Sequence, residues 1–267
     1  MVSFSALFVS GLMATAALAA PHQAHQHLHA KRSTTKKGAA YNEASLVSAL
    51  TGVSWAYNWN MESDGTLPNG VEYVPMLWGP KMYSGWSDAA NSALSSGSKY
   101  LMGFNEPDVA SQANLSPSQA ASDYKQYMTP YANQATLVSP AVSNSGSSGQ
   151  GLDWMKSFLS ECSDCKVSAL AVHWYADASL TDYFKQFVNQ AIDLANQNNI
   201  PEVWITEFQA TGDDTSQVQF LTEIIPWLES QQGVGRYSYF MCSDSVLLTA
   251  ANVLSDIGKA YMSLTSS

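Results

Sequence analysis

Short apolar or aromatic runs alternate with segments of helical character along most of this chain. Strands that alternate with helices pair in parallel, because each helix carries the chain back to the same end of the sheet. Seven runs are typical of strands: Val53–Trp59, Tyr73–Trp78, Tyr100–Phe104, Leu137–Val142, Ala169–Tyr175, Val203–Phe208 and Tyr237–Met241. Lys37–Tyr41 is expected to be an eighth strand, although its composition favours a strand only weakly. Eight parallel strands predict an α/β fold, a (β/α)8 TIM barrel in a single domain.

Helix signals occupy the segments between these runs. Thr181–Gln197 carries apolar side chains at helical spacing, and Ser116 followed by Pro117 is typical of a helix start. Pro226 is expected to bend or end the helix that contains it. The expected helices are Glu43–Leu50, Ser116–Tyr131, Thr181–Gln197, Thr215–Leu228 and Asn252–Leu264.

The first 32 residues differ from the rest of the chain. Residues 1–19 are apolar and uncharged, and Ala17-Leu18-Ala19 offers the small side chains that signal peptidase prefers, which predicts a secretory signal peptide. A membrane anchor is the alternative, disfavoured because the apolar run is short and polar sequence follows at once. Residues 20–32 hold four histidines and end in Lys31-Arg32, which favours a pro-segment ending in a dibasic site over a metal-binding tract.

The remaining residues, 33–267, are acidic. They carry 22 Asp and Glu against ten Lys and Arg, a net charge of −12. Nucleic-acid binding needs basic patches, so this charge argues against a nucleic-acid partner. No apolar stretch after residue 20 is long enough to cross a bilayer, so no membrane partner is expected. The pattern suits a secreted monomer that acts on a neutral polymer, and Asn114-Leu115-Ser116 is its one clear glycosylation sequon.

Three cysteines are present: Cys162, Cys165 and Cys242. The close pair follows a predicted helix instead of opening one, which disfavours a thioredoxin-like redox motif. A zinc site is not expected, because no second cysteine pair exists and His173 is the only histidine after residue 32. The sequence therefore predicts a small local disulfide between Cys162 and Cys165, with Cys242 as a buried free thiol at the end of a strand.

Two of the expected strands carry a glutamate at or just after their carboxyl ends. Glu106 stands in Gly103-Phe104-Asn105-Glu106-Pro107-Asp108, and Glu207 stands in Trp204-Ile205-Thr206-Glu207-Phe208, 101 residues further on. A carboxylate at the exit of a buried strand is costly unless it is solvated, paired or used. The strand count places Glu106 after strand four and Glu207 after strand seven, at one end of the barrel. Such a pair fits the two carboxylates of a retaining glycoside hydrolase, and two unrelated surface carboxylates are the alternative.

The motifs resemble those of fungal glycoside hydrolases of family 128, the group related to the alkali-sensitive linkage protein. They are Val53–Trp59, Tyr73–Gly79, Asn105-Glu106-Pro107, Ala171–Tyr175 and Ile205–Phe208, in the expected order across nearly all of residues 33–267. The resemblance implies a (β/α)8 barrel that cleaves β-1,3-glucan with retention. No cofactor is expected, and the signal peptide predicts a protein that acts outside the cell or in its wall. It also implies that Glu106 is the acid/base, that Glu207 is the nucleophile, and that residues 33–267 form the catalytic domain.

His173 and Tyr175 are candidates for contacts in the same site. They stand two residues apart on one strand, so their side chains share a face, which is expected to point into the mouth of the barrel. Either side chain is then placed to hydrogen-bond the nucleophile and keep it ionised. A satisfied core histidine is the alternative for His173, and a metal role is not expected because no ligand cluster accompanies it in the sequence.

Further residues are expected to bind the sugar. Asn105 is expected to hydrogen-bond the 2-hydroxyl group, a contact that strengthens in the transition state. Tryptophans at the carboxyl ends of strands offer flat apolar surfaces for sugar rings, whereas core packing is the better interpretation for Trp55 and Trp204. The expected platforms are Trp59, Trp78 and Trp174, and the weaker candidates for hydroxyl contacts are Asn58 and Asn144.

Two other functions remain open at this point. A non-catalytic wall-binding barrel has no need for two glutamates, so intact Glu106 and Glu207 argue against it. A barrel glycosidase acting on β-1,4-glucan or mannan is consistent with the same residues, because groove shape and loop conformation decide the linkage that is cleaved.

Overall fold

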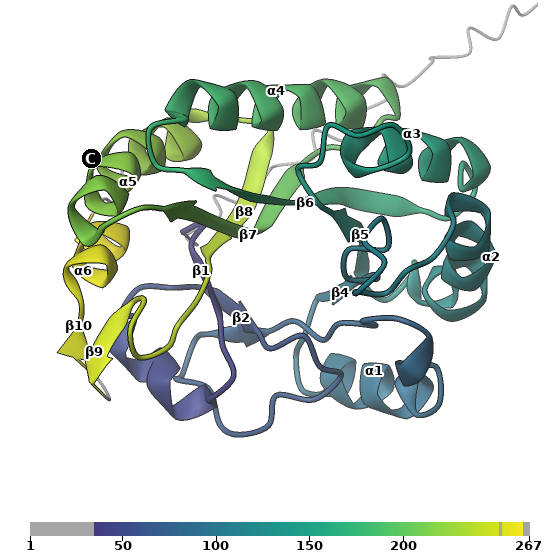
Figure 1. Cartoon of the computed structure of the whole chain (residues 1–267). Coiled ribbons are helices and arrows are strands. Elements are labelled where there is room, and N and C mark those ends of the chain that lie inside the picture. The colour runs from purple at the N-terminus through teal and green to yellow at the C-terminus, as the bar shows by residue number, and fades with distance from the viewer. Residues whose placement is uncertain (1–34, 251–252, 264–267) are drawn as a thin grey trace, which may run out of the picture. The chain divides into compact units, whose positions relative to one another are not determined.

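The computed structural model describes residues 35–250 and 253–263 (Figure 1). The signal-peptide and pro-segment predictions, at residues 1–32, lie outside these described residues. Within the described ranges, no helix combines the length and the apolar character needed to cross a membrane.

Eight parallel strands in chain order form two sheets. The larger sheet contains β4 (Tyr100–Met102), β5 (Thr136–Val142), β6 (Val167–Asp177), β7 (Val203–Thr211) and β8 (Val234–Tyr239). The smaller sheet contains β1 (Gly38–Ala40), β2 (Trp55–Tyr57) and β3 (Glu72–Tyr73). Isolated parallel bridges link the two sheets, Met76 to Met102 on one side and Lys37 to Tyr237 on the other. The predicted α/β class and the curled parallel arrangement are confirmed, but the ladder is not one continuous eight-stranded sheet.

The regular pairing between parallel strands is short at β3. The sequence predicts a strand over Tyr73–Trp78, whereas the regular strand is only Glu72–Tyr73. Pro75 has no N–H to donate to a neighbouring strand, so the ladder is interrupted there. Pairing returns as a single bridge at Met76, and the Pro75 carbonyl accepts a hydrogen bond from the Met102 amide.

Helices surround the strands in Figure 1. They are α1 (Trp86–Ser95), α2 (Pro117–Tyr127), α3 (Gly151–Glu161), α4 (Thr181–Gln197), α5 (Asp214–Ser230) and α6 (Asp256–Ser263), with 3-10 turns η1 (Ala44–Ala49), η2 (Pro80–Met82) and η3 (Thr129–Tyr131). The prediction for α4 is confirmed at both ends. Pro226 lies inside α5 and does not end it. The sequence did not predict α1 or the hairpin of β9 (Leu248–Ala250) and β10 (Val253–Leu254).

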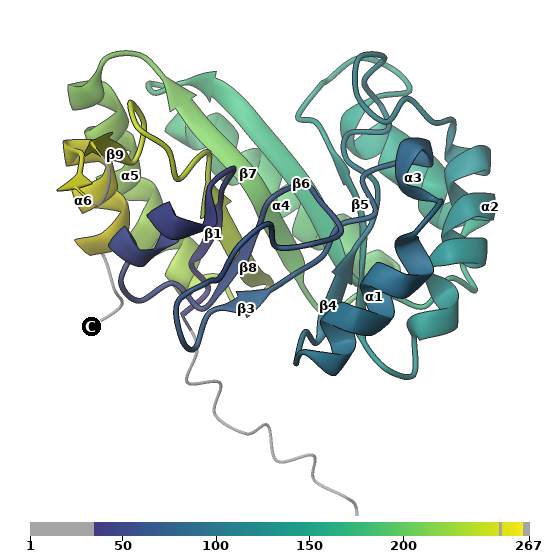
Figure 2. The same cartoon turned by 90° about the horizontal axis from the view of Figure 1, so that it is seen from below.

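The strand pair β6 and β7 is the longest part of the ladder, and Figure 2 shows the two strands side by side. The apolar runs Ala169–Val172 of β6 and Val203–Ile205 of β7 are fully buried, as expected for strands covered on both faces. At the amino-terminal end of the strands, the guanidinium of Arg236 lies over the rings of Tyr100 and Trp204 and pairs with Glu72 at 2.7 Å. Trp55 and Trp204 are fully buried, as the core interpretation predicted.

The cysteine predictions are confirmed. Cys162 and Cys165 form a disulfide directly after α3. Cys242 is a buried free thiol in bridge contact with Tyr41, and burial raises the pKa of the thiol to about 12. The sequon residue Asn114 is exposed in the loop that precedes α2.

Candidate active site

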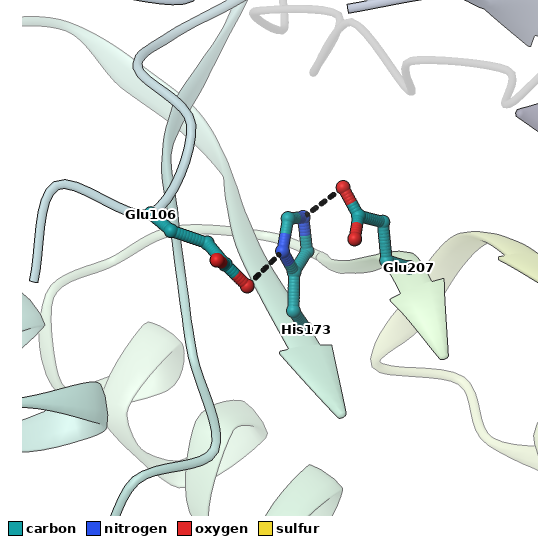
Figure 3. A group of neighbouring side chains, drawn as sticks. All are labelled: Glu106, His173 and Glu207. Atoms are coloured by element: carbon teal, nitrogen blue, oxygen red, sulfur yellow. Dashed lines mark hydrogen bonds and ion pairs between the residues drawn. The ribbon is translucent and has the colours of Figure 1, made fainter. Parts of the chain in front are cut away.

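Glu106, His173 and Glu207 meet at the carboxyl-terminal side of the larger sheet (Figure 3). Glu106 follows β4, His173 lies on β6 and Glu207 lies on β7. One nitrogen or oxygen atom from each of the three side chains lies within 4.8 Å of the others. The fold therefore brings together the two glutamates that the sequence predicts as a pair, with the imidazole between them.

Glu207 is surrounded by hydrogen-bond donors. Its Oε1 accepts from the indole N–H of Trp59 at 2.6 Å and lies 3.5 Å from the Tyr57 hydroxyl. Its Oε2 accepts from the Tyr175 hydroxyl at 2.5 Å. Burial, and then the charge of Glu207, raise the pKa of both tyrosines, so they stay protonated and act as donors. The carboxylate of Glu207 is thus held by an indole at one oxygen and by a phenol at the other.

Glu106 has a different environment. Its Oε1 lies 2.9 Å from Nδ1 of His173, and its side chain is 14% exposed against 7% for Glu207. Its backbone has a φ of 41°, in the left-handed region that is costly for a residue with a side chain. The amide of Glu106 donates to the Ala141 carbonyl on β5 at 2.8 Å, which ties this unusual turn to the sheet.

His173 is fully buried and connects the two carboxyl groups. Its Nε2 lies 3.0 Å from the hydroxyl of Thr206 and 3.4 Å from Oε1 of Glu207. Burial alone would lower the pKa of the imidazole, but the carboxylates of Glu207, Glu106 and Asp108 together raise it above its usual value. The core-histidine and site-residue interpretations therefore both describe His173, because it is buried and lies in the site.

A cleft of about 470 Å³ opens over the glutamates. Its lining combines carboxylate, amide and aromatic side chains: Asn42, Trp59, Trp78, Asn105, Glu106, Gln112, Tyr175, Glu207, Phe240 and Met241. The mixture of aromatic faces and a few polar groups is typical of a small-molecule or sugar site.

The two tryptophans of the cleft have distinct surroundings. Trp59, with a φ of 56°, packs edge-on against Tyr57 and Phe240. Trp78 has the Lys81 ammonium 3.5 Å from the centroid of its ring, so a cation covers one face of the indole. Both line the cleft as the sequence predicts, and their contact with sugar stays a prediction.

Trp174 is not part of the cleft, which corrects the sequence-based expectation. It lies between His173 and Tyr175 on β6, so strand alternation turns its side chain to the opposite face. There it is fully buried between the sheet and the helices, stacked on Phe220 of α5 at 5.4 Å. The position of Trp174 at a strand end predicted a sugar platform. The alternation of side chains along β6 instead places its ring on the face of the sheet that is turned away from the cleft.

Asn58 and Asn144 also do not line this cleft. Asn58 donates to the Glu62 carbonyl and to Asp64, and accepts from the Tyr73 hydroxyl, which orders the loop between β2 and β3. Asn144 accepts from the Tyr175 amide and donates to the Tyr175 carbonyl. The two residues therefore support neighbours of the site and are not hydroxyl contacts within it.

Asn105 lines the cleft beside Glu106. Its amide group donates to Gln112 at 3.3 Å, and its side-chain oxygen is buried with no hydrogen-bond partner among the described residues. A buried acceptor without a partner is costly, so this oxygen is ready to accept a hydrogen bond from a ligand.

Several further residues build the site, and the sequence did not predict them. Tyr57 could have been found, because it stands two residues from both Trp55 and Trp59 in the expected strand Val53–Trp59, which predicts one shared face for the three side chains. Asp108 accepts hydrogen bonds from the Ser143 amide and hydroxyl and from the Gly151 amide, and so ties the segment after β4 to the start of α3. No local pattern signals this role, since the partners are distant in sequence.

The cluster also bears on the question of a metal. Glu106, His173 and Glu207 are residue types that bind metal ions, so the sequence-based reason for dismissing a metal, the lack of accompanying ligands, was wrong. Hydrogen bonding accounts for the arrangement, because both ring nitrogens of His173 are engaged by side chains of the protein.

Comparison with known proteins agrees with this geometry. Residues 38–261 match the protein-family model described as glycosyl hydrolase catalytic core. The chain is 32% identical to Alkali-sensitive linkage protein 1 of Schizosaccharomyces pombe over 234 residues, 79% of this chain, and spans about 40% of the length of that relative.

Two solved structures are similar over most of their length. One is a curdlan-specific exo-β-1,3-glucanase of glycoside hydrolase family 128, subgroup III, from Blastomyces gilchristii, solved with glucose. It is 47% identical, with a TM-score of 0.82 over 85% of this chain and 97% of that one. The other is an endo-β-1,3-glucanase of subgroup I from Amycolatopsis mediterranei, solved with laminaritriose. It is 29% identical, with a TM-score of 0.72 over 86% of this chain and 99% of that one.

Proposed function

The chain belongs to the glycosyl hydrolase catalytic core family, within glycoside hydrolase family 128, and from this premise we propose that it is a secreted, retaining β-1,3-glucanase. The observation that carries the proposal is the pair Glu106 and Glu207, which face each other across His173 in a cleft lined by aromatic side chains. The 47% identity to a β-1,3-glucanase supports the choice of linkage.

The environments of the two glutamates support different roles. Glu207, held by the donors Trp59 and Tyr175, is suited to attack the anomeric carbon as a carboxylate. Glu106, with the imidazole of His173 as its hydrogen-bond partner, is suited to protonate the leaving oxygen and then to activate a water molecule. Retaining enzymes hold their two carboxyl groups about 5–5.5 Å apart, leaving no room for a water between them. Carboxylate oxygens within 4.8 Å of each other support that mechanism.

The cleft supports binding of a glucan chain. Trp59 and Trp78 offer indole faces to the apolar sides of glucose rings. The side-chain oxygen of Asn105 accepts a hydrogen bond from the 2-hydroxyl group of the sugar bound at the reaction centre. Polysaccharide is thus the partner, and the chain works as a monomer without a cofactor.

A closed (β/α)8 barrel is the proposed fold of the catalytic domain. Eight parallel strands follow in chain order, and bridges join the two sheets at both edges, from Met76 to Met102 and from Lys37 to Tyr237. A third bridge, from Tyr41 to Cys242, continues the contact between the first and last strands toward the cleft.

Secretion and remodelling or degradation of fungal cell-wall glucan are the proposed setting. The apolar first residues, the exposed sequon at Asn114 and the disulfide of Cys162 with Cys165 support export to an oxidising compartment. Amino-terminal sequencing of the protein from culture medium would test this, with a start directly after Arg32 as the expected result. Retention inside the cell with residues 1–32 attached would contradict it.

A substrate panel tests the activity. Purified protein would be incubated with curdlan, laminarin and carboxymethylcellulose, and new reducing ends measured. We expect hydrolysis of the two β-1,3-glucans and none of the cellulose derivative. Release of β-anomers in the first minutes, followed by proton NMR, would support retention, whereas initial α-anomers would place a water between the carboxyl groups. Single glucose units as the product would indicate exo cleavage, and longer oligosaccharides endo cleavage.

Glutamate variants test the assignment of roles. Glu207→Ala should lose hydrolysis and regain turnover with added azide, which enters the space of the carboxylate. Glu106→Ala should lose about 10²–10⁴-fold on poor leaving groups, the usual contribution of an acid catalyst, and much less on good ones. Near-normal laminarin hydrolysis by either variant would refute the proposal.

A further inference from the structure

Two consecutive side chains on β7 approach the same imidazole. In a regular strand Thr206 and Glu207 would point to opposite faces. Here Val172 pairs with Ile205, while His173 pairs with Glu207, so Thr206 is the extra residue of a β-bulge. A bulge redirects a side chain, and bulges are frequent beside active sites. As a result the Thr206 hydroxyl lies 3.0 Å from Nε2 of His173, closer than Glu207 Oε1 at 3.4 Å.

The Thr206 hydroxyl can pair with Nε2 in every protonation state of the ring, because a hydroxyl both donates and accepts. It accepts from Nε2–H when the imidazole is charged. It donates to the bare nitrogen when the only ring proton is on Nδ1, facing Glu106. An ionised Glu207 can only accept, so of these two neighbours only Thr206 serves both states.

We propose that Thr206 is a positioning residue, whose hydroxyl holds the His173 ring between the two glutamates and keeps Nε2 from turning to the nucleophile. This role rests on the proposed function, in which Glu106 gives its proton to the leaving oxygen and regains one from the attacking water. Without the hydroxyl, Nε2–H has Glu207 Oε1 as its remaining partner. A hydrogen bond from a cation to that oxygen would withdraw charge from the attacking carboxylate.

The charges around the ring favour the protonated imidazole. Glu106 and Asp108 approach from the segment after β4, and Glu207 from β7. Tyr57 on β2 and Tyr175 on β6 are the other titratable groups at the site, and both stay neutral because burial and the carboxylates raise their pKa values. Without the Thr206 hydroxyl, the acceptor left for Nε2–H is Glu207 Oε1, which lies 3.4 Å away and already accepts from Trp59 at 2.6 Å. This contact is longer than the 3.0 Å contact with Thr206, so the charged ring should release its proton more readily.

The test compares Thr206→Val, which removes the hydroxyl at nearly constant volume, with Thr206→Ser, which keeps it. For Thr206→Val we expect the pKa of His173, read by NMR of labelled imidazole, to fall by about one pH unit, the size of one lost hydrogen bond to a charged group. We expect kcat on laminarin to fall about tenfold with little change in KM. The basic limb of the pH profile of kcat should move to lower pH by about one unit, as the pKa of His173 does. Thr206→Ser should keep the wild-type position of that limb.

Ser139→Ala is the matched control. Ser139 is a buried hydroxyl between β5 and β6 that accepts from the Ala171 amide at 2.9 Å. Its loss should lower the melting temperature without moving the pKa of His173. Thr206→Ala is a second variant without the hydroxyl, and melting curves of all variants would establish that they are folded.

Two outcomes would overturn the inference. One is an unchanged His173 pKa and an unchanged kcat in Thr206→Val. The other is a Thr206→Ser variant that behaves like Thr206→Val, since the methyl group and not the hydroxyl would then matter. The NMR titration needs no turnover, so failure of the protein to hydrolyse glucan would refute the proposed function while leaving the role of Thr206 testable.

Discussion

Neighbouring side chains make two glutamates of the same chemical type unequal. Glu207 accepts hydrogen bonds from an indole and a phenol, whereas the hydrogen-bond partner of Glu106 is the imidazole of His173. The two carboxyl groups therefore have different hydrogen-bond partners, which supports separate chemical roles for the two residues. Trp59 is the less expected donor, because tryptophans at a cleft are usually considered for their flat faces.

Trp59→Phe should separate these two uses of the ring. Phenylalanine keeps an aromatic surface but removes the N–H that donates to Glu207 at 2.6 Å. We expect kcat to fall about 10–100-fold, as for one lost hydrogen bond to a charged group, with a smaller change in KM. Trp86→Phe is the control, because it removes the indole N–H that donates to the Tyr127 carbonyl away from the site, and it should leave kcat alone. An unchanged kcat in Trp59→Phe would show that the indole N–H does not contribute to turnover and would leave only the aromatic face of Trp59 as a contact for sugar.

Trp78→Ala tests the other platform. In an inactive Glu207→Gln background, the variant should bind a long β-1,3-oligosaccharide more weakly by about 1–3 kcal/mol, with little loss of stability. Truncation of a core tryptophan would instead cost about 3–5 kcal/mol of folding stability. Calorimetric titration and thermal melting on the same protein decide between the two. A large drop in melting temperature with unchanged affinity would assign Trp78 to the core.

At the scale of elements, the carboxyl-terminal end of α5 depends on a distant lysine. Lys36, just before β1, donates from Nζ to the carbonyls of Leu228, Glu229 and Gln231, at 3.0, 2.9 and 2.7 Å. The last carbonyls of a helix have no partner within the helix, and a cation there also interacts favourably with the negative end of the helix dipole. The lysine thus connects the last long helix to the first strand.

Lys36→Met should show the value of this contact. Methionine keeps an unbranched side chain of similar length but offers no donor, so three carbonyls lose a partner. We expect a loss of about 1–3 kcal/mol in the free energy of unfolding, measured by urea denaturation. Lys185→Met, which breaks an exposed pair with Glu223, is the control and should cost about 1 kcal/mol or less. Equal effects of the two substitutions would contradict a capping role.

The helices and strands also show which parts of the fold and of the site the sequence alone could predict. Periodicity located α4 and the strands of the larger sheet, because buried strands and amphipathic helices leave regular patterns. Alternation along β6 places His173 and Tyr175 on the site face. The same rule excludes Trp174, for which the position at a strand end wrongly predicted a sugar platform. The bulge at Thr206 was not predictable, since it depends on the register between β6 and β7 and not on residue type.

For the whole molecule, the site contributes to the pH dependence of stability. The carboxylates around His173 raise the pKa of the imidazole in the folded state above the ordinary value of about 6.5. The folded protein therefore binds the proton more tightly than the unfolded chain does. This contribution to stability is fully present below the unfolded pKa and is lost as pH rises through the folded pKa.

His173→Gln should remove this dependence. The difference in unfolding free energy between wild type and variant should be largest below about pH 6.5 and should shrink as pH rises. Urea denaturation across a pH series measures it, and only the pH-dependent part is diagnostic, because loss of buried hydrogen bonds adds a constant. A difference that is flat or that grows with pH would contradict a raised pKa.

The two sheets contribute different residues to the cleft. Glu106, His173 and Glu207 belong to the five-stranded sheet, with its long continuous ladder. Trp59 and Trp78 follow β2 and β3, in the three-stranded sheet that isolated bridges join to the larger one. Loops carried by a short ladder open more readily and tolerate change better than a buried ladder does. Evolution can therefore alter which glucan is held by exchanging Trp78 after β3, while Trp59, which donates to Glu207, is retained together with the chemistry of bond cleavage on the larger sheet.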